Sequence, residues 1–154
     1  MLLTDTSQPD RSSIVAMAYF SICRPSASNP NSHLDKWVFT AVPLTNDHDQ
    51  ELCKGMIDFA VSTRRKAMSG IAHVFVELVA TRHEYKGKGA GGLLLRHIRV
   101  VADEERLPIF VETNGAIVKF YEKLGFEIKE TMAMPGGLGY EEFILIREPH
   151  SEQP

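Results

Sequence analysis

Apolar and polar residues alternate along the chain with two different periods, which predict where its strands and helices lie. Alternating or continuous apolar positions predict strands over 14–22, 73–81, 109–113, 126–132 and 140–147. Apolar residues spaced three or four apart predict helices over 47–69, 90–106 and 116–124. A chain of 154 residues suffices for one domain. We therefore expect a single α/β (α+β) domain over residues 1–149, followed by a frayed tail, 150–154.

The first 42 residues combine one clear strand with polar stretches. Residues 14–22 carry apolar side chains on both faces, which predicts a strand covered on both sides. Met1–Thr4 has the residues of a short strand, which would form a hairpin with it. The polar segments 5–13 and 25–35 are expected to be surface loops. Trp37–Val42 fits a strand and a packed loop equally well.

The helix expected over 47–69 has recognisable ends. Asp47 or Asp49 can accept hydrogen bonds from its first turn, and Gly70 suits the turn that ends a helix. The basic triplet 64–66 (Arg-Arg-Lys) lies near the C-terminal end, where the helix dipole favours positive charge. We expect this triplet to be a solvated helix end rather than a binding site.

The strand expected over 73–81 contains one residue out of keeping with the rest. By alternation, one face consists of Val74, Val76, Leu78 and Ala80, and the other of Phe75, Glu77, Val79 and Thr81. Glu77 is an acid in the middle of an otherwise apolar strand. Burial would raise the pKa of this carboxyl group, which suits a group that accepts a proton near neutral pH.

A glycine-rich segment connects this strand to the helix expected over 90–106. It reads Lys86-Gly87-Lys88-Gly89-Ala90-Gly91-Gly92. The first N–H groups of a helix have no intrahelical acceptor, and the helix dipole adds positive charge there. The glycines leave those N–H groups unscreened, and the two lysines add charge at the rim. The segment therefore predicts a site for an anion, which we interpret as a diphosphate.

Two common nucleotide-binding motifs do not account for this segment. Gly87–Gly92 satisfies G-x-G-x-x-G, and Glu112 lies at about the distance at which the dinucleotide fold places its ribose-binding acid. That fold, however, turns directly at the strand end, whereas residues 82–86 intervene here. No Gly-Lys-[Ser/Thr] of a phosphate-binding P-loop follows. A nicotinamide-dependent enzyme is therefore the least favoured class.

Two motifs carry a resemblance to a known family. Val79–Leu95 (V-A-T-R-H-E-Y-K-G-K-G-A-G-G-L-L-L) resembles motif A of the GNAT superfamily of acetyl-CoA-dependent N-acetyltransferases, with Lys86 where its [Q/R]-x-x-G-x-[G/A] core has Gln or Arg. Phe120–Phe126 (F-Y-E-K-L-G-F) resembles the superfamily's Y-E-K-x-G-F ending. Further similarity at 102–104, 107–108 and 110–113 is greatest to the fungal and actinobacterial branch that includes puromycin N-acetyltransferase. The resemblance covers about half the chain, from residue 73 to 149.

The resemblance implies a fold and a cofactor, acetyl-CoA. The fold is a mixed, mostly antiparallel sheet with helices on both faces, in which two splayed strands, here 73–81 and 109–114, hold the cofactor. The implied cofactor-binding residues are Val79, Ala80, Thr81 and Asn114 for the pantetheine arm, Lys86, Gly87, Lys88, Gly89, Ala90, Gly91 and Gly92 for the pyrophosphate, and Tyr121. Relatives place a strand and one or two helices ahead of the hairpin 1–22, so we expect these elements to be missing here.

The resemblance also implies direct transfer, in which an amine attacks the thioester of acetyl-CoA. Tyr121 matches the family tyrosine that donates a proton to the sulfur, although it would also fit a purely apolar stripe on its helix. Glu77 is our first candidate for the base, Glu112 is its competitor, and a water relay is the third option. His73, His83 and His97 are expected to be a strand-end, a loop and a helix-surface residue.

The expected function is thus acetylation of a primary amine on a small molecule, without a metal. The alternative is a catalytically impaired GNAT domain that binds acyl-CoA. A net charge of −3 and a pI near 6.1 do not indicate a nucleic-acid-binding protein. No apolar run approaches the ~20 residues of a membrane span. Two cysteines without metal spacing and no visible signal peptide predict a reduced, cytoplasmic setting. Dimerisation around Tyr140–Ile146 is common in relatives.

Overall fold

The computed structural model describes residues 1–5, 14–29, 31, 34, 45–47, 49–134, 139 and 141–150. Its strands are β1 (Leu2–Thr4), β2 (Ile14–Cys23), β3 (His73–Thr81), β4 (Ile109–Asn114), β5 (Glu127–Ala133) and β6 (Glu141–Arg147). Its helices are α1 (Gln50–Met68), α2 (Ala90–Glu104) and α3 (Val118–Glu122), with a short 3₁₀ turn, η3 (His83–Tyr85). The segment 37–42 and most of the loop expected over 5–13 lie outside the described residues.

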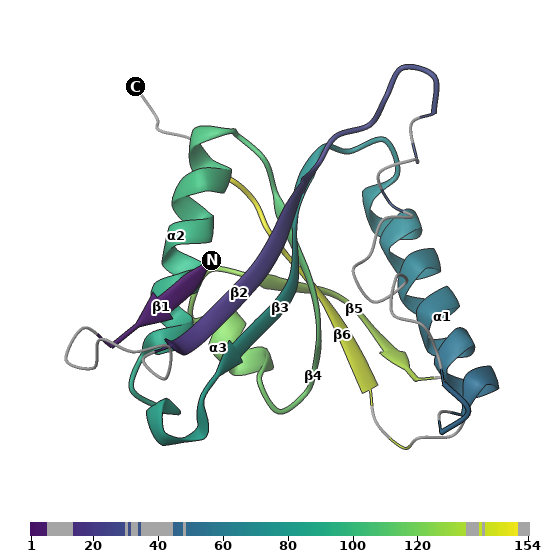
Figure 1. The fold of residues 1–154 in the computed structure, drawn as a ribbon. Helices are drawn as coiled ribbons and strands as arrows, with labels where there is room; N and C mark the ends of the chain where they lie inside the picture. The colour runs from purple at the N-terminus through teal and green to yellow at the C-terminus, as the bar shows by residue number, and fades with distance from the viewer. Residues whose placement is uncertain are drawn as a thin grey trace.

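The strands form one sheet in the order β1-β2-β3-β4-β6-β5 (Figure 1). Only β3 and β4 run parallel, and all other neighbours are antiparallel. The prediction of a mixed, mostly antiparallel sheet is therefore confirmed, and so is the short strand at the N-terminus. β6 lies between β4 and β5, so the strand at 141–147 is not an edge of the sheet, and dimerisation through it stays a prediction.

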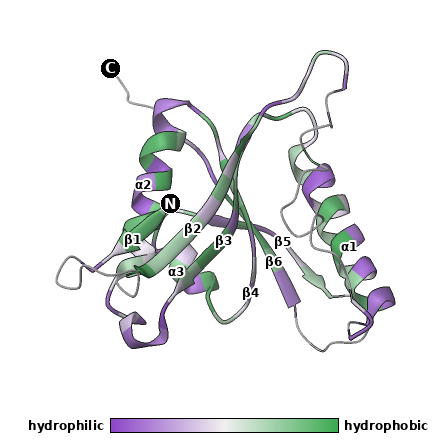
Figure 2. Cartoon of the chain, viewed as in Figure 1, coloured by the Kyte–Doolittle hydropathy of each residue, from purple (hydrophilic) through white to green (hydrophobic). Residues whose placement is uncertain are grey.

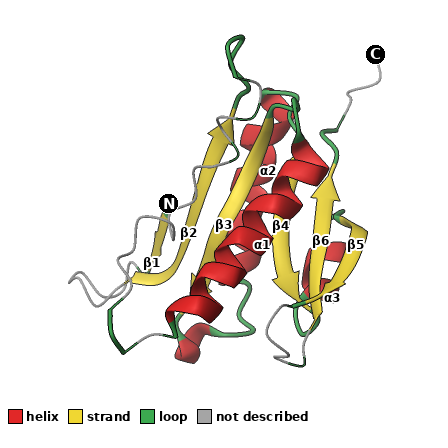
Figure 3. Ribbon diagram, turned by 90° about the vertical axis from the view of Figure 1, so that its right-hand side faces the viewer, coloured by secondary structure: helices red, strands yellow, loops and turns green. Residues whose placement is uncertain are grey.

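Helices cover both faces of the sheet, as expected. α2 and α3 lie on one face and α1 lies on the other, which the two views in Figures 1 and 3 show together. α2 buries Leu94, Leu95, Ile98 and Ala102 against β2 and β3. Figure 2 shows apolar and polar stretches alternating along α1 and α2, the pattern of helices with one buried side.

The expectation that β2 is covered on both faces is wrong. Ala16 and Ala18 are buried against the α2 layer, but Met17 is 38% and Tyr19 is 46% exposed. The cause is the position of α1. Among the described residues, the cluster that contains Ala67 and Met68 of α1 includes residues of β3, β4, β5 and β6, but from β2 it includes only the last residue, Cys23. Most of β2 therefore lies beyond α1.

The basic triplet also differs from expectation. Arg64 is only 2% exposed, and its guanidinium lies 4.2 Å from the centroid of the Phe75 ring. The reason is helical spacing: Arg64 is one turn from Met68, which is buried on the same side of α1. Lys66, in contrast, is exposed and pairs with Glu130 at 2.6 Å, so the solvated interpretation holds for the end of the triplet.

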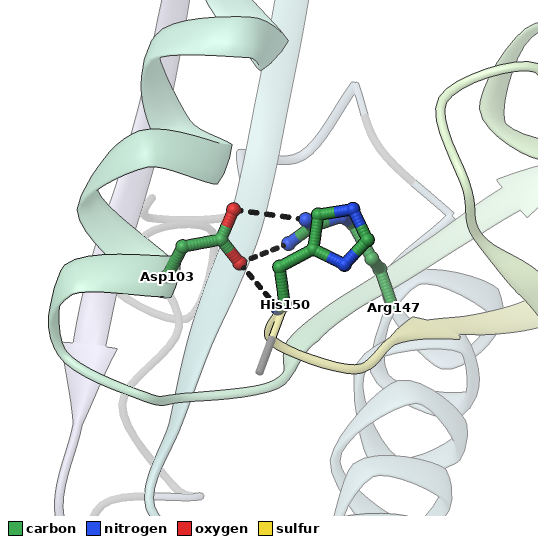
Figure 4. Close-up of polar contacts among 3 residues, drawn as sticks. All are labelled: Asp103, Arg147 and His150. Carbon is green, nitrogen blue, oxygen red and sulfur yellow. Dashed lines mark hydrogen bonds and ion pairs between the residues drawn. The ribbon is translucent and has the colours of Figure 1, made fainter. Parts of the chain in front are cut away.

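The C-terminal segment is attached to α2 by a cluster of polar contacts (Figure 4). The guanidinium of Arg147 donates two hydrogen bonds to the carboxylate of Asp103, at 2.8 and 2.9 Å. The backbone N–H of His150 donates a third, at 2.8 Å. Arg147 holds the pKa of Asp103 below its usual value, chiefly through these hydrogen bonds. The tail expected to fray from residue 150 is thus held at its first residue.

Candidate functional site

The parallel pair at the centre of the sheet separates after a short stretch. β3 and β4 pair only through Val74 with Ile109 and Phe75 with Phe110. Beyond these residues the two strands diverge, so their facing edges have no partner strand within the described chain. Backbone N–H and C=O groups along such edges can bond to an extended ligand. This arrangement confirms the expectation of two splayed strands.

A bulge in β3 reverses the faces that alternation predicted. Tyr19 pairs with Leu78 and the next residue, Phe20, pairs with Val76, so Glu77 is opposite no residue of β2. Up to Glu77 the predicted faces are correct. Beyond it they are exchanged, and Val79 packs into the α2 layer with Val74 and Val76. An extra residue in one strand shifts the side-chain alternation by one.

The glycine segment forms the turn that starts α2. Gly87 and Gly89 adopt φ values of 77° and 85°, in the left-handed region that glycine enters without strain. The first bond of the helix runs from the N–H of Leu93 to the carbonyl oxygen of Gly89 at 2.9 Å. The N–H groups that precede Leu93 therefore lack an intrahelical acceptor. Lys86 and Lys88 are exposed beside them, and the turn η3 separates the glycines from β3, which supports rejecting the dinucleotide motif.

This helix start lies against the end of β3 and against α3. A Cβ atom added to Gly91 would lie 3.6 Å from the Phe120 ring, 3.6 Å from Thr81 Oγ1 and 3.7 Å from Val79 Cγ1. The structure thus brings together the residues expected for the pantetheine arm on β3 and those expected for the pyrophosphate. Across the gap, the side chain of Asn114 accepts a hydrogen bond from the N–H of Ala116 at 3.0 Å, so it shapes the turn after β4.

Tyr121 lies on α3 in the same layer. It is 4% exposed, and its ring packs edge-on against those of Phe120 and Phe126. The helix ends as predicted: Gly125 has φ 86°, and the N–H of Phe126 bonds to the carbonyl oxygen of Tyr121 at 3.2 Å. Burial raises the pKa of Tyr121 to about 12, so its phenol keeps its proton at neutral pH.

On the opposite face, under α1, the diverging strands border a pocket of about 220 Å³. It is lined by Met56, Phe59, Ala60, Phe75, Val76, Glu77, Glu112, Met134 and Glu142. The three carboxylates come from three strands, and none of these lining residues is basic. Glu77 accepts a hydrogen bond from the hydroxyl of Ser21. Glu112 and Glu142 also line a larger, open depression of about 910 Å³ at the end of β4.

Glu112 is the most perturbed carboxyl group of this pocket. Its Oε1 atom is shielded from solvent and has no hydrogen-bond partner among the described residues, although the residue as a whole keeps some exposed surface. Burial raises the pKa of Glu112 to about 8, Glu142 adds to the effect and Arg64 opposes it. Burial also raises the pKa of Glu142. Both groups therefore hold a proton at a higher pH than an exposed carboxyl group does.

Sequence reasoning identified Glu77 and Glu112 in this pocket but missed Glu142. In the β4–β6 ladder, Glu112 is opposite Ile144 and Asn114 is opposite Glu142. Opposite residues of an antiparallel pair share a face, so Glu112 and Glu142 are diagonal neighbours. The signal in the sequence is that Glu142 is an acidic residue at the start of an otherwise apolar strand. Its proximity to Glu112 depends on the register between β4 and β6, which the sequence does not reveal. The histidines lie as expected, with His97 exposed on α2.

Comparison with known proteins agrees with this geometry. A family model described as an acetyltransferase (GNAT) domain matches residues 44–128, more than half of the chain. No curated protein is significantly similar to the chain.

Solved structures share the fold at low identity. The NatC complex bound to Gag peptide and CoA contains a chain 14% identical, with a TM-score of 0.59 over 97% of this chain and 70% of that one. The histone acetyltransferase HPA2 and related acetyltransferase from Corynebacterium glutamicum is 18% identical, with a TM-score of 0.57 over 99% of this chain and 65% of that one. Chaetomium thermophilum Naa20 in complex with a bisubstrate analogue is 12% identical, with a TM-score of 0.56 over 96% of this chain and 64% of that one.

This chain therefore spans 64 to 70% of the length of these three chains. No helix in the part of the chain that the structure describes is long and apolar enough to cross a membrane. The splayed strands and the exposed amides at the start of α2 fit the cofactor of the matched family. On the family match, the chain belongs to the GNAT acetyltransferases, the N-acetyltransferases that take their acetyl group from acetyl-CoA.

Proposed function

We propose that this protein acetylates a primary amine on a small molecule by direct transfer from acetyl-CoA. The observation that carries the proposal is the early separation of β3 from β4 beside the glycine turn of α2. It provides unpaired strand edges for an amide-containing arm and unpaired N–H groups for a diphosphate. A second support is the resemblance to the branch that includes puromycin N-acetyltransferase.

The proposed cofactor site uses both strands and the helix start. Within residues 87–92 the N–H of Lys88 donates to the carbonyl oxygen of Tyr85 at 3.2 Å, so the other N–H groups of this segment would hold the pyrophosphate. Lys86 and Lys88 would contribute charge at the rim. Residues 79–81 of β3 and Asn114 of β4 would lie along the pantetheine arm. This path brings the thioester to the gap between the strands, where one face leads to the pocket under α1.

The reaction requires two proton transfers. The acceptor arrives as an ammonium and must lose a proton before its nitrogen can form a bond to the carbonyl carbon. When the carbon–sulfur bond breaks, the leaving thiolate takes up a proton, and the balance releases one proton to solvent. Tyr121 is our candidate acid, since it matches the family tyrosine that donates a proton to the sulfur and its phenol, with a pKa raised to about 12, is protonated at neutral pH.

Two carboxylates compete for the role of base. Glu77 was favoured by its position in the sequence, and it lines the pocket where the amine would enter. Glu112 lines the same pocket, and its pKa of about 8 suits a base that works near neutral pH. Comparing the pH–rate profiles of Glu77→Gln and Glu112→Gln separates them. The base is the residue whose loss removes the acidic limb, and retention of that limb in both variants would favour a water relay.

The decisive test of function has two stages. A thermal-shift titration with acetyl-CoA measures cofactor binding, and release of free coenzyme A thiol with a panel of polyamines, aminoglycosides and arylamines measures transfer. We expect both signals. Binding without any transfer would replace the proposal with the alternative of an impaired acyl-CoA-binding domain. An absence of binding to acetyl-CoA would overturn the cofactor assignment itself.

Other acceptors give the test a further outcome. The NatC and Naa20 structures are described with a peptide and with a bisubstrate analogue, so a peptide N-terminus belongs in the panel. Acetylation of peptides alone would contradict the small-molecule proposal while supporting acetyl transfer. We further expect the protein to act in a reducing cytoplasm, on the basis of its cysteine usage.

A further inference from the structure

The two lysines of the glycine segment occupy different positions in a tight turn. Lys86 has φ −60° and ψ 137°, and Gly87 has φ 77°, values typical of the central positions of a type II turn. The turn is closed by the hydrogen bond from the N–H of Lys88 to the carbonyl oxygen of Tyr85. Tyr85 and Lys88 are therefore its first and last residues and lie beside each other, whereas Lys86 lies at its tip.

The side chains of these two end residues are in contact. The ammonium nitrogen of Lys88 lies 5.3 Å from the centroid of the Tyr85 ring, within the ~6 Å range of a cation–π attraction. The guanidinium of Arg82 lies near the limit of this range, at 6.0 Å, and it is paired with Glu84 at 2.6 Å. Within the described part of the chain, no ring contact or ion pair holds the side chain of Lys86.

The Tyr85 ring that supports Lys88 is itself fixed by the fold. Its hydroxyl group donates a hydrogen bond to a carboxylate oxygen of Asp5, the residue after β1, at 2.9 Å. The ring is partly buried and packs against the core that α2 covers, and the N–H of Tyr85 donates to the carbonyl oxygen of Arg82 at 2.9 Å. The ring can therefore hold the ammonium of Lys88 in one place, although the lysine itself is exposed.

We propose that Tyr85 is a positioning residue for the cofactor: its ring holds the ammonium group of Lys88 at the start of α2, ready for the pyrophosphate of coenzyme A. This inference rests on the proposed cofactor site and gives its two lysines unequal roles. A lysine that is already ordered loses less side-chain entropy when it binds a ligand. An ammonium group has three N–H donors, so that of Lys88 can stay on the ring and still donate to a phosphate oxygen.

A double-mutant cycle, read by calorimetric titration of coenzyme A, tests the inference. Lys88→Gln should weaken binding roughly tenfold, the value of one charge-assisted hydrogen bond, and Lys86→Gln, a matched loss of charge, should weaken it by a smaller factor. Tyr85→Leu removes the ring and should weaken binding roughly threefold. That effect should persist in the Lys86→Gln background and disappear in the Lys88→Gln background. Tyr85→Phe keeps the ring and should bind better than Tyr85→Leu.

A merely structural role for Tyr85 predicts a different pattern. Tyr85→Leu would then weaken binding by the same factor in both lysine backgrounds. That result, equal losses in the two lysine variants, or equal losses in Tyr85→Phe and Tyr85→Leu would overturn the inference and leave the cofactor site standing. If wild-type protein does not bind coenzyme A, the cofactor assignment fails and the inference fails with it.

The wild-type protein decides the matter if Tyr85→Leu does not fold. The ring current of Tyr85 should move the NMR signals of the ε-methylene protons of Lys88 upfield of those of Lys86, both before and after addition of coenzyme A. Identical shifts for the two lysines would overturn the inference, because Lys88 would then not lie on the ring.

Discussion

Replacing Glu112 with Gln should change how the stability of the protein depends on pH. Glu112 is buried under α1, and its pKa is raised from 4.5 to about 8. Between these values the carboxyl group is protonated in the folded protein and ionised in the unfolded chain. The unfolded chain then binds fewer protons, so stability is highest below the unfolded pKa and falls as the pH rises.

The size of the effect follows from the two pKa values. Their difference is 8 − 4.5, about 3.5 pH units, and each unit corresponds to about 1.4 kcal/mol. The group would therefore lower the free energy of unfolding by up to about 5 kcal/mol across the whole window, of which about 3 kcal/mol is lost by pH 7. A fully exposed carboxylate would produce no such slope, because its pKa would be the same in both states.

The assay is urea unfolding of the wild type and Glu112→Gln at several pH values within this window. Gln is neutral throughout, so the variant lacks the contribution from position 112. Its amide donors could remain unsatisfied in the buried site, but that cost would be the same at every pH. The difference in unfolding free energy between the two proteins, plotted against pH, therefore isolates the titration of Glu112. We expect the variant to gain about 3 kcal/mol relative to the wild type between the lower end of the window and pH 7.

Other titrating groups largely cancel in this difference. Asp103 and Glu127 have lowered pKa values and contribute in the opposite direction, but they are present in both proteins. Glu142 acts electrostatically on Glu112, so it is the acidic group among the described residues whose own titration the substitution is expected to change. Parallel pH profiles for wild type and variant would refute the burial of Glu112 and, with it, the reasoning that makes this residue a base.

Three further substitutions test other parts of the structure. Tyr121→Phe keeps the ring packed against its aromatic neighbours and should lower kcat roughly a hundredfold or more without a loss of melting temperature; unchanged turnover in thiol-release assays would remove the acid role. Gly89→Ala and Gly70→Ala both force an L-residue into positive φ. Each should lower the free energy of unfolding, measured with denaturant, by about 1–2 kcal/mol. Only Gly89→Ala should weaken the binding of coenzyme A, measured by calorimetry. Arg147→Met breaks the pair with Asp103 and should lower the free energy of unfolding by about 3 kcal/mol near neutral pH. The loss should be smaller in acid, because the stability contributed by Asp103 disappears as the pH falls through its lowered pKa. An equal loss near neutral pH and in acid would contradict this prediction.

Local signals predicted the boundaries of several elements well. Asp49 caps α1 by accepting a hydrogen bond from the N–H of Leu52 at 3.0 Å, and Gly125 ends α3 in the left-handed conformation. In both cases the residue that determines the structure lies within a few positions of the group it contacts, so the sequence contains the whole interaction. The glycine turn of α2 was identifiable for the same reason.

Features that depend on pairing between distant segments were not predictable. The bulge at Glu77 exists because β3 supplies one more residue than β2 in their ladder, and alternation within one strand cannot reveal it. The burial of Arg64 depends on the Phe75 ring that lies beneath it. Glu142 joins Glu112 only through the register of β4 and β6. The acidic character of the pocket is thus a property of the sheet rather than of any one segment.

The bulge also gives the two faces of the sheet different surroundings, which would let one sheet serve two ligands of opposite charge. Before Glu77, β3 directs Phe75 towards α1; after it, Val79 and Thr81 face the start of α2. The unpaired N–H groups of that helix offer positive potential on one face, and the acidic side chains of the pocket lie on the other. A diphosphate and a cationic amine would then approach from opposite sides without competing for the same charges. Since β3 and β4 are paired at only two positions, a substitution that extended this pairing should close the strand edges proposed for the pantetheine arm, and it should therefore block transfer and weaken coenzyme A binding.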